Sequence, residues 1–231
     1  MAQFKLALAL VSMAIAACSA AYPNRPPSEF SWKDVAKTDI DRVTEIHLQE
    51  TLFHLKTLME KLYRRNPGEW RKNGTSNFDS VVARVFDRRD FAFSYLQGRR
   101  GVDAVVLAFR EDYPGDRVAA YIVGLMTMIL SAYGDRTEFF MLDELDPQRL
   151  YNSARNVEIA VWKLSNSRDS RNQLYLLSNE SDSAVRNLSF EREFGKIIAE
   201  LDTMARIIST QNNRSIVRVI QNVATAVFLP I

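Results

Sequence analysis

The sequence is poor in the residues that form cross-links, tight turns and metal sites. Its 231 residues include one Cys, two His, eight Gly and seven Pro. A single Cys excludes a disulfide within the chain. The scarcity of Gly and Pro, together with little strand-like alternation of apolar and polar residues, favours an all-α fold. Hydrophobic residues make up 47% of the chain, which is enough for the core of one globular domain.

An excess of one charge is lacking as well. The formal net charge is +2 at neutral pH, so no strong field favours nucleic acid as a partner. The sequence also has no Gly-x-Ser-x-Gly nucleophile elbow, no Walker loop and no dinucleotide-binding fingerprint. These absences favour binding over catalysis without deciding between them.

An uncharged run extends from Val118 to Tyr133 and is closely bounded by charged residues. It is shorter than the roughly 18–20 residues that a bilayer-spanning helix needs. The run therefore predicts a central buried helix over 118–133, surrounded by an irregular multi-helix bundle. Ala120 and Gly124 lie four residues apart, and small side chains at that spacing allow a neighbouring helix to come close.

Apolar periodicity and capping signals predict further helices on both sides of this run. Thr38 is the expected N-cap of the first helix, and Asp146 with Pro147 begins a later one. The final helix is inferred from apolar spacing between Ile216 and Val227, and Pro230 should end it. The expected helices cover residues 39–65, 67–72, 77–88, 102–111, 147–166, 189–211 and 214–228, all within a single helical domain at 38–231.

The N-terminus has the pattern of an export signal. Lys5 precedes an apolar run, and small residues follow that run. The segment Ile15-Ala16-Ala17-Cys18 at its end resembles the lipobox of bacterial lipoproteins. That resemblance implies a signal peptide at 1–17 and a covalent lipid on Cys18, which then anchors the mature chain to a membrane. No other cofactor is expected.

The residues after the lipobox refine this expectation. In enteric lipoproteins, a Ser such as Ser19 after the Cys implies the periplasmic face of the outer membrane. Residues 18–37 are Pro-rich and predict an extended tether. An alternative is ordinary cleavage after Ala20 or Ala21, which would give a secreted or soluble periplasmic protein.

Both histidines lie on the first predicted helix. His47 and His54 are seven residues apart, and Glu50 lies between them on the same side. Two imidazoles and a carboxylate could bind a metal ion. A His–Glu contact on a helix surface is the simpler interpretation. The pattern is not specific, because a di-iron bundle needs matching ligands on other helices.

A basic and aromatic segment follows that helix. It is a candidate interaction surface, because cations and aromatic rings at a corner of the chain could contact acidic lipid head groups or an acidic protein. Cations at helix C-termini are also common without any partner. The candidate residues are Tyr63, Arg64, Arg65, Trp70, Arg71 and Lys72.

The sequence thus predicts an envelope-anchored lipoprotein whose helical periplasmic domain is a binding, interaction or structural module. Its expected partners are the membrane, through the lipid, and an envelope protein or acidic lipid head groups. One alternative is a helical periplasmic enzyme or metal-binding protein that uses His47, Glu50 and His54. Another is a plain secreted helical protein.

Overall fold

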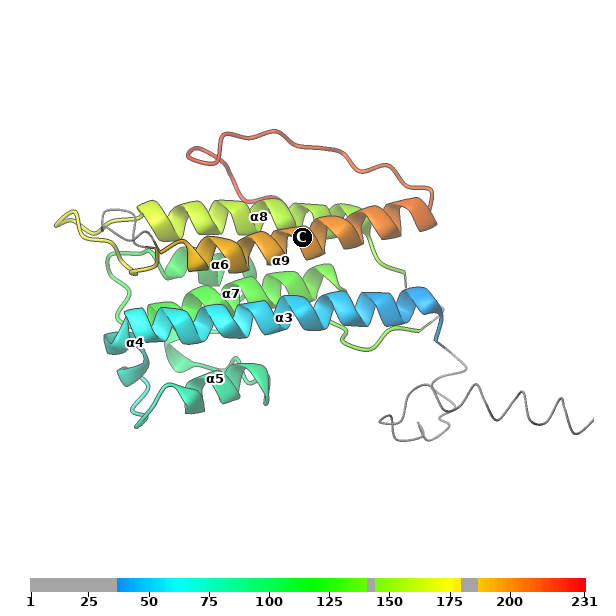
Figure 1. Cartoon of the computed structure of the whole chain (residues 1–231). Coiled ribbons are helices and arrows are strands. Elements are labelled where there is room, and N and C mark those ends of the chain that lie inside the picture. The colour runs from blue at the N-terminus through cyan, green and yellow to red at the C-terminus, as the bar shows by residue number, and fades with distance from the viewer. Residues whose placement is uncertain (1–36, 141–143, 180–186) are drawn as a thin grey trace, which may run out of the picture. The chain divides into compact units, whose positions relative to one another are not determined.

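Periodic apolar residues produce helices throughout the part of the chain that the structure describes. The computed structural model describes residues 37–140, 144–179 and 187–231 (Figure 1). These ranges contain no β-strand, and Arg168 and Leu174 form an isolated bridge. The predicted all-α fold is confirmed. Cys18, the signal segment and nearly all of the expected tether lie outside the described residues.

Most helix boundaries lie close to the predicted ones. In chain order the elements are α3 (Asp39–Arg65), α4 (Pro67–Arg71), α5 (Asp79–Phe86), the short 3₁₀ helix η2 (Ser94–Leu96), α6 (Gly101–Leu107), α7 (Arg117–Ala132), α8 (Pro147–Asn166) and α9 (Ser189–Gln211). Two are shorter than expected. α5 ends before Asp87, and the left-handed φ of 49° at Arg89 then turns the chain. α6 ends at Leu107 in place of residue 111.

The predicted caps are present. Thr38 Oγ1 accepts from the Asp41 N–H at 3.3 Å, and Asp41 Oδ2 accepts from the Thr38 N–H at 2.6 Å, which completes a capping box. Asp146 Oδ1 accepts from the Gln148 N–H at 2.9 Å, with Pro147 in the first turn of α8. These side chains bond backbone donors that a helix start leaves unpaired, so they fix where α3 and α8 begin.

α7 is the central helix of the described residues. Every side chain from Val118 to Leu130 is buried, and α7 packs against α3, α4, α6 and α8. α9 lies between α3 and α8 and contacts both (Figure 1). Within the described ranges, none of the helices combines the length and the apolar character that crossing a membrane requires.

α6 and α7 cross closely at Gly124. A Cβ atom placed on Gly124 would lie 2.6 Å from the Val105 backbone nitrogen and 2.8 Å from the Gly101 carbonyl oxygen. Contacts this short do not occur in folded proteins, so the crossing requires a residue without a side chain. The small residue that the sequence placed on one face of the central helix is therefore a packing requirement.

The final predicted helix is wrong. Residues 214–228 are extended, with a turn at 223–225, and belong to a segment that we call the strap, residues 212–231. In Figure 1 the strap leaves the end of α9, runs along α8 and then folds back. Ile220, expected on the inward face of a helix, is 99% exposed. The physical reason is that side chains of α8 bond the strap backbone, as described below.

Candidate functional site

The histidines of α3 each pair with a carboxylate of α9. His54 Nδ1 lies 2.9 Å from Glu193 Oε2, and both side chains are buried. His47 Nδ1 pairs with Glu200 Oε2 nearer the other end of the interface. Since a carboxylate only accepts, each Nδ1 carries the proton of its hydrogen bond. The two pairs connect helices that are distant in sequence.

This arrangement does not assemble the metal ligand set inferred from the sequence. Glu50 is exposed, and the carboxylates that meet His47 and His54 come from α9. Among residues 37–140, 144–179 and 187–231, no three His, Cys, Asp or Glu side chains are grouped as a metal site. The i, i+3 and i+7 spacing placed the three on one helix, but α9 covers only part of that side.

The basic and aromatic segment is divided by the fold. Tyr63 is fully buried, which corrects its assignment to a surface. Lys72 donates to Glu69 and to the Gly115 carbonyl oxygen at 3.0 Å. The exposed remainder includes Arg64 and Arg71, and the Arg71 guanidinium lies 4.9 Å from the centre of the half-buried Trp70 ring. Arg65 is half-buried.

Tyr63 belongs instead to a buried polar cluster at the start of α7. Asp116 accepts from the Tyr63 hydroxyl at 2.7 Å, from Asn73 Nδ2 at 2.6 Å and from the Ala119 N–H at 2.9 Å. Tyr95 donates to Asn73 Oδ1 at 2.6 Å. Burial raises the pKa of the Asp116 carboxyl, while its three hydrogen bonds oppose that shift. The cluster thereby joins α3 and the residue Asn73 after α4 to the start of α7.

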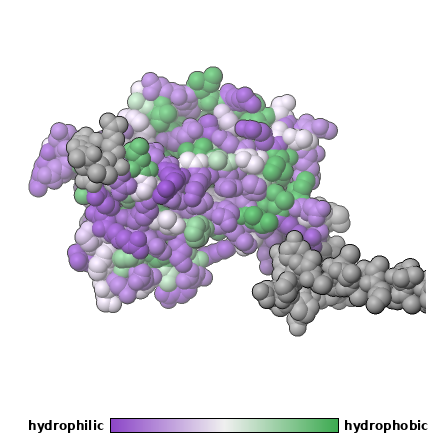
Figure 2. Space-filling view, in the orientation of Figure 1, coloured by the Kyte–Doolittle hydropathy of each residue, from purple (hydrophilic) through white to green (hydrophobic). Residues whose placement is uncertain are grey.

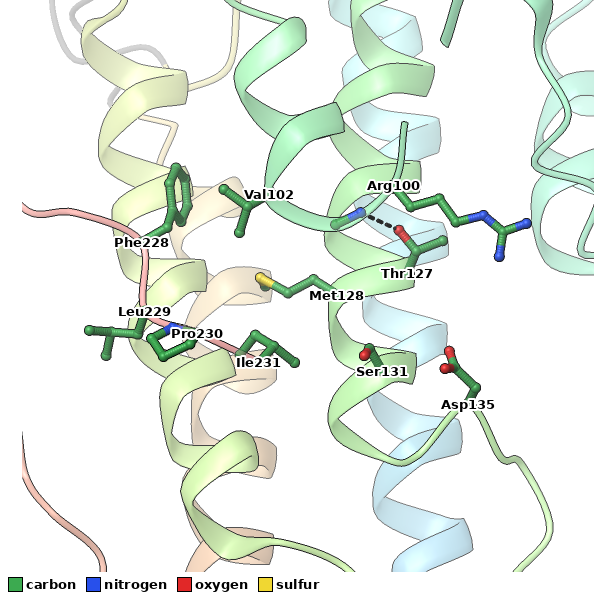
Figure 3. A pocket seen from close by; sticks show the side chains of 11 residues that line it. Arg100, Val102, Thr127, Met128, Ser131, Asp135, Phe228, Leu229, Pro230 and Ile231 are labelled. Carbon is green, nitrogen blue, oxygen red and sulfur yellow. Dashed lines mark hydrogen bonds between the residues drawn. The ribbon is translucent and has the colours of Figure 1, made fainter. Parts of the chain in front are cut away.

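A pocket in the described part of the chain lies between α6, α7 and the end of the strap (Figure 3). Its volume is about 590 Å³. Val102 and Met128 point towards Phe228 and Ile231 across its apolar side, as Figure 3 shows. The lining residues are Arg100, Gly101, Val102, Thr127, Met128, Ser131, Asp135, Phe228, Leu229, Pro230 and Ile231.

One wall of this pocket is held by buried asparagine side chains of α8. Asn156 Nδ2 donates to the Leu229 carbonyl oxygen at 2.8 Å, and Asn156 Oδ1 accepts from the Leu229 N–H at 2.6 Å. Asn152 Nδ2 donates to the Pro230 carbonyl oxygen at 2.9 Å. A side-chain amide thereby bonds an extended residue as a neighbouring β-strand would.

The first half of the strap is held in the same way. Gln148 Oε1 accepts from the Val217 N–H at 2.8 Å, and Gln148 Nε2 donates to the Val217 carbonyl oxygen at 3.1 Å. The Tyr151 hydroxyl contacts both the N–H and the carbonyl oxygen of Val219. We call Gln148, Tyr151, Asn152 and Asn156 the α8 clamp. All four bond the backbone of the strap and none bonds its side chains.

The sequence contains a signal for the clamp. Gln148, Asn152 and Asn156 recur every four residues along α8, so they lie on one face of that helix. Amide side chains on one face of a helix have to find partners when that face is covered. The partner could not be named, because the apolar spacing of the strap indicated a helix.

No protein-family model, curated protein or solved structure matches this chain. The function therefore has to be argued from the site itself.

Proposed function

We propose that this protein is an envelope-anchored lipoprotein whose helical domain is a binding module. The anchor is inferred from Ile15-Ala16-Ala17-Cys18 at the end of an apolar segment. A lipid on Cys18 would hold the domain at a membrane, and Ser19 favours the periplasmic face of the outer membrane. A Pro-rich tether would let the domain reach a partner in the same compartment.

The pocket beside α6 is the observation that carries the binding function. Its volume of about 590 Å³ lies in the range of about 300–1,000 Å³ that is usual for ligand sites. Apolar side chains line one side, and the hydroxyls of Thr127 and Ser131 line another. This combination suits a partner that inserts an apolar group and leaves its polar atoms at the rim.

A second contact is proposed for the exposed part of the basic segment. Arg64 and Arg71 are cations at the surface, and Arg71 lies over the half-buried Trp70 ring. Acidic lipid head groups or an acidic envelope protein would complement them. Binding through these residues should weaken as salt rises, because the Debye length shortens from about 10 Å at 0.1 M to about 3 Å at 1 M.

The anchor is tested by fractionating cells that express wild type or Cys18→Ala. We expect the wild-type protein in the membrane fraction and the variant in the soluble fraction. Mass spectrometry of the native protein should show a lipid on Cys18. A native N-terminus at Ala21 or Tyr22 would contradict the anchor and leave the domain as a secreted module.

The pocket is tested by filling it. Val102→Trp places a large ring at the pocket, whereas Val106→Trp places the same ring on the exposed side of the same helix. Partners recovered from envelope fractions with wild type should be lost with Val102→Trp and kept with Val106→Trp. Equal recovery with both variants would refute the pocket as the binding site.

A further inference from the structure

The strap occupies a site whose chemistry is not specific to the strap. The α8 clamp contacts backbone N–H and carbonyl groups, which every extended peptide presents. Such backbone bonds supply affinity in proteins that bind peptides as added strands, and neighbouring pockets supply selectivity. Here the pocket beside Val102 and Met128 adjoins the last four residues of the strap.

The buried amides show that the site is built for a backbone. Asn156 is fully buried and Asn152 is 7% exposed, so their amides need partners. Both amide atoms of Asn156 bond Leu229. An apolar side chain at these positions would have no such requirement. If the strap left, another peptide backbone could satisfy the same atoms.

The strap itself is weakly buried along its middle. Val217, Ile220 and Val227 are exposed by 69%, 99% and 74%, respectively. Figure 2 shows hydrophobic atoms at the upper edge, where Figure 1 draws the strap. Segments with few buried apolar contacts open at a lower free energy than the core. The strap can therefore detach while the α3–α9 bundle stays folded.

We propose that the α8 clamp and the adjoining pocket form a binding site for an extended peptide that carries bulky apolar residues, and that the strap occupies this site in the resting chain. The occupant is defined by what the site holds now, which is the sequence Phe228-Leu229-Pro230-Ile231 with its backbone bonded and its apolar side chains at the pocket. This proposal deepens the binding function above and rests on it.

Occupancy of the site by the strap should lower the apparent affinity for an external peptide. A peptide can bind only the fraction of molecules whose strap has detached, so its apparent affinity is reduced by that fraction. A tethered segment competes at an effective concentration of about millimolar. Releasing the strap should therefore strengthen binding of an external peptide, although no residue of the clamp is altered.

The test uses the full chain with Leu229→Pro. Proline has no N–H, so it removes the donor to Asn156 Oδ1 and leaves α8 intact. A fluorescently labelled peptide of residues 224–231 is titrated and followed by anisotropy. We expect Leu229→Pro to bind at least about tenfold more tightly than wild type. Ile220→Pro, at a fully exposed strap residue, is the matched control and should bind as wild type does.

A second variant shows whether the clamp is the receptor. Leu229→Pro combined with Asn156→Ala should lose the gain in affinity. Saturable binding of the labelled peptide to Leu229→Pro that disappears when Asn156→Ala is added supports the proposal. A folded Leu229→Pro that binds no peptide, or that binds it equally well when Asn156→Ala is added, overturns it.

Hydrogen exchange of wild type decides the case if Leu229→Pro does not fold. The Leu229 amide should exchange through local opening, at a markedly lower protection than amides in the middle of α7. Equal protection at both places would show that the strap detaches only on global unfolding, and would overturn the proposal. Loss of peptide binding would leave the Val102→Trp result standing, so the two proposals can fail separately.

Discussion

α7 and the strap are similar in apolar composition but differ in secondary structure. Both are rich in Val, Ile and Ala, and both have apolar side chains at helical spacing. α7 is a buried helix that satisfies its own backbone, whereas the strap is extended and relies on α8 for hydrogen bonds. Apolar periodicity therefore reports which residues can be buried, but the source of backbone hydrogen bonds decides the conformation.

An isoleucine in α7 and an isoleucine in the strap show the difference between the two segments most clearly. Ile122 is fully buried in α7, and Ile220 is 99% exposed in the strap. Ile122→Ala should lower the free energy of unfolding by about 2–5 kcal/mol, through lost burial and the cavity left behind. Ile220→Ala should change it by less than about 0.5 kcal/mol. Urea denaturation of both variants measures the difference, and equal losses would show that the strap residue is buried.

The start of α7 should be the next most sensitive place. Asp116→Ala removes the acceptor for the Tyr63 hydroxyl, Asn73 Nδ2 and the Ala119 N–H, and leaves these buried donors without their partner. We expect a loss on the order of 3 kcal/mol in chemical denaturation. Asp112→Ala, at an exposed carboxylate paired with Arg110, is the control and should cost much less. Similar losses in the two variants would contradict a structural role for the cluster.

The same carboxylate predicts a dependence on pH. Since burial raises its pKa in the folded chain, the folded chain keeps the proton over a range in which the unfolded chain has lost it. The contribution of Asp116 to the free energy of unfolding should therefore fall as pH rises through that range, starting near the ordinary pKa of about 3.9. The difference in stability between wild type and Asp116→Asn, measured from acid to neutral pH, should decline accordingly. A difference that grows with pH would mean that the hydrogen bonds outweigh burial.

A substitution at the crossing of α6 and α7 should have a smaller effect on stability, and its sign can be predicted. Gly124→Ala places a Cβ against the Val105 backbone and should cost about 1–3 kcal/mol. Gly195→Ala, in α9, meets nothing within 4 Å and should stabilise the chain by about 0.5–1 kcal/mol through helix propensity. Thermal unfolding of the two variants checks both signs. Stabilisation by Gly124→Ala would contradict a close crossing of α6 and α7 at this residue.

The sequence predicted those parts of the fold in which local signals and burial agree. The Thr38 cap, Asp146 with Pro147, and the apolar run of α7 all indicated helices that the structure contains. It did not predict the strap, because the partners of the strap backbone lie on α8, far away in sequence. The partners of His47 and His54 could not be predicted for the same reason, since their carboxylates come from α9.

The candidate site was harder to predict than the fold. Tyr63 was grouped with neighbouring cations because adjacent residues look like one surface in a sequence. On α3, however, Tyr63 and Arg64 point in directions about 100° apart, so one is buried and the other exposed. The pocket required Val102, Met128 and Ile231 to meet, and only the folded chain brings α6, α7 and the strap together.

The smallest effect concerns the clamp and tests whether the strap is a separate unit. Asn156→Ala removes both bonds to Leu229, and the freed backbone can turn to water, so the loss should be about 1 kcal/mol. Gln148→Ala should cost a similar amount at Val217. Asn166→Ala, at the exposed end of α8, is the control and should cost only a few tenths of a kcal/mol.

The double variant, Gln148→Ala with Asn156→Ala, tests whether the strap detaches as one unit. If it does, the double variant should lose less stability than the sum of the two single losses, because the total loss cannot exceed the free energy of docking the strap. Full additivity in urea denaturation, with a total above about 2 kcal/mol, would make the strap part of the cooperative core and erase its contrast with α7.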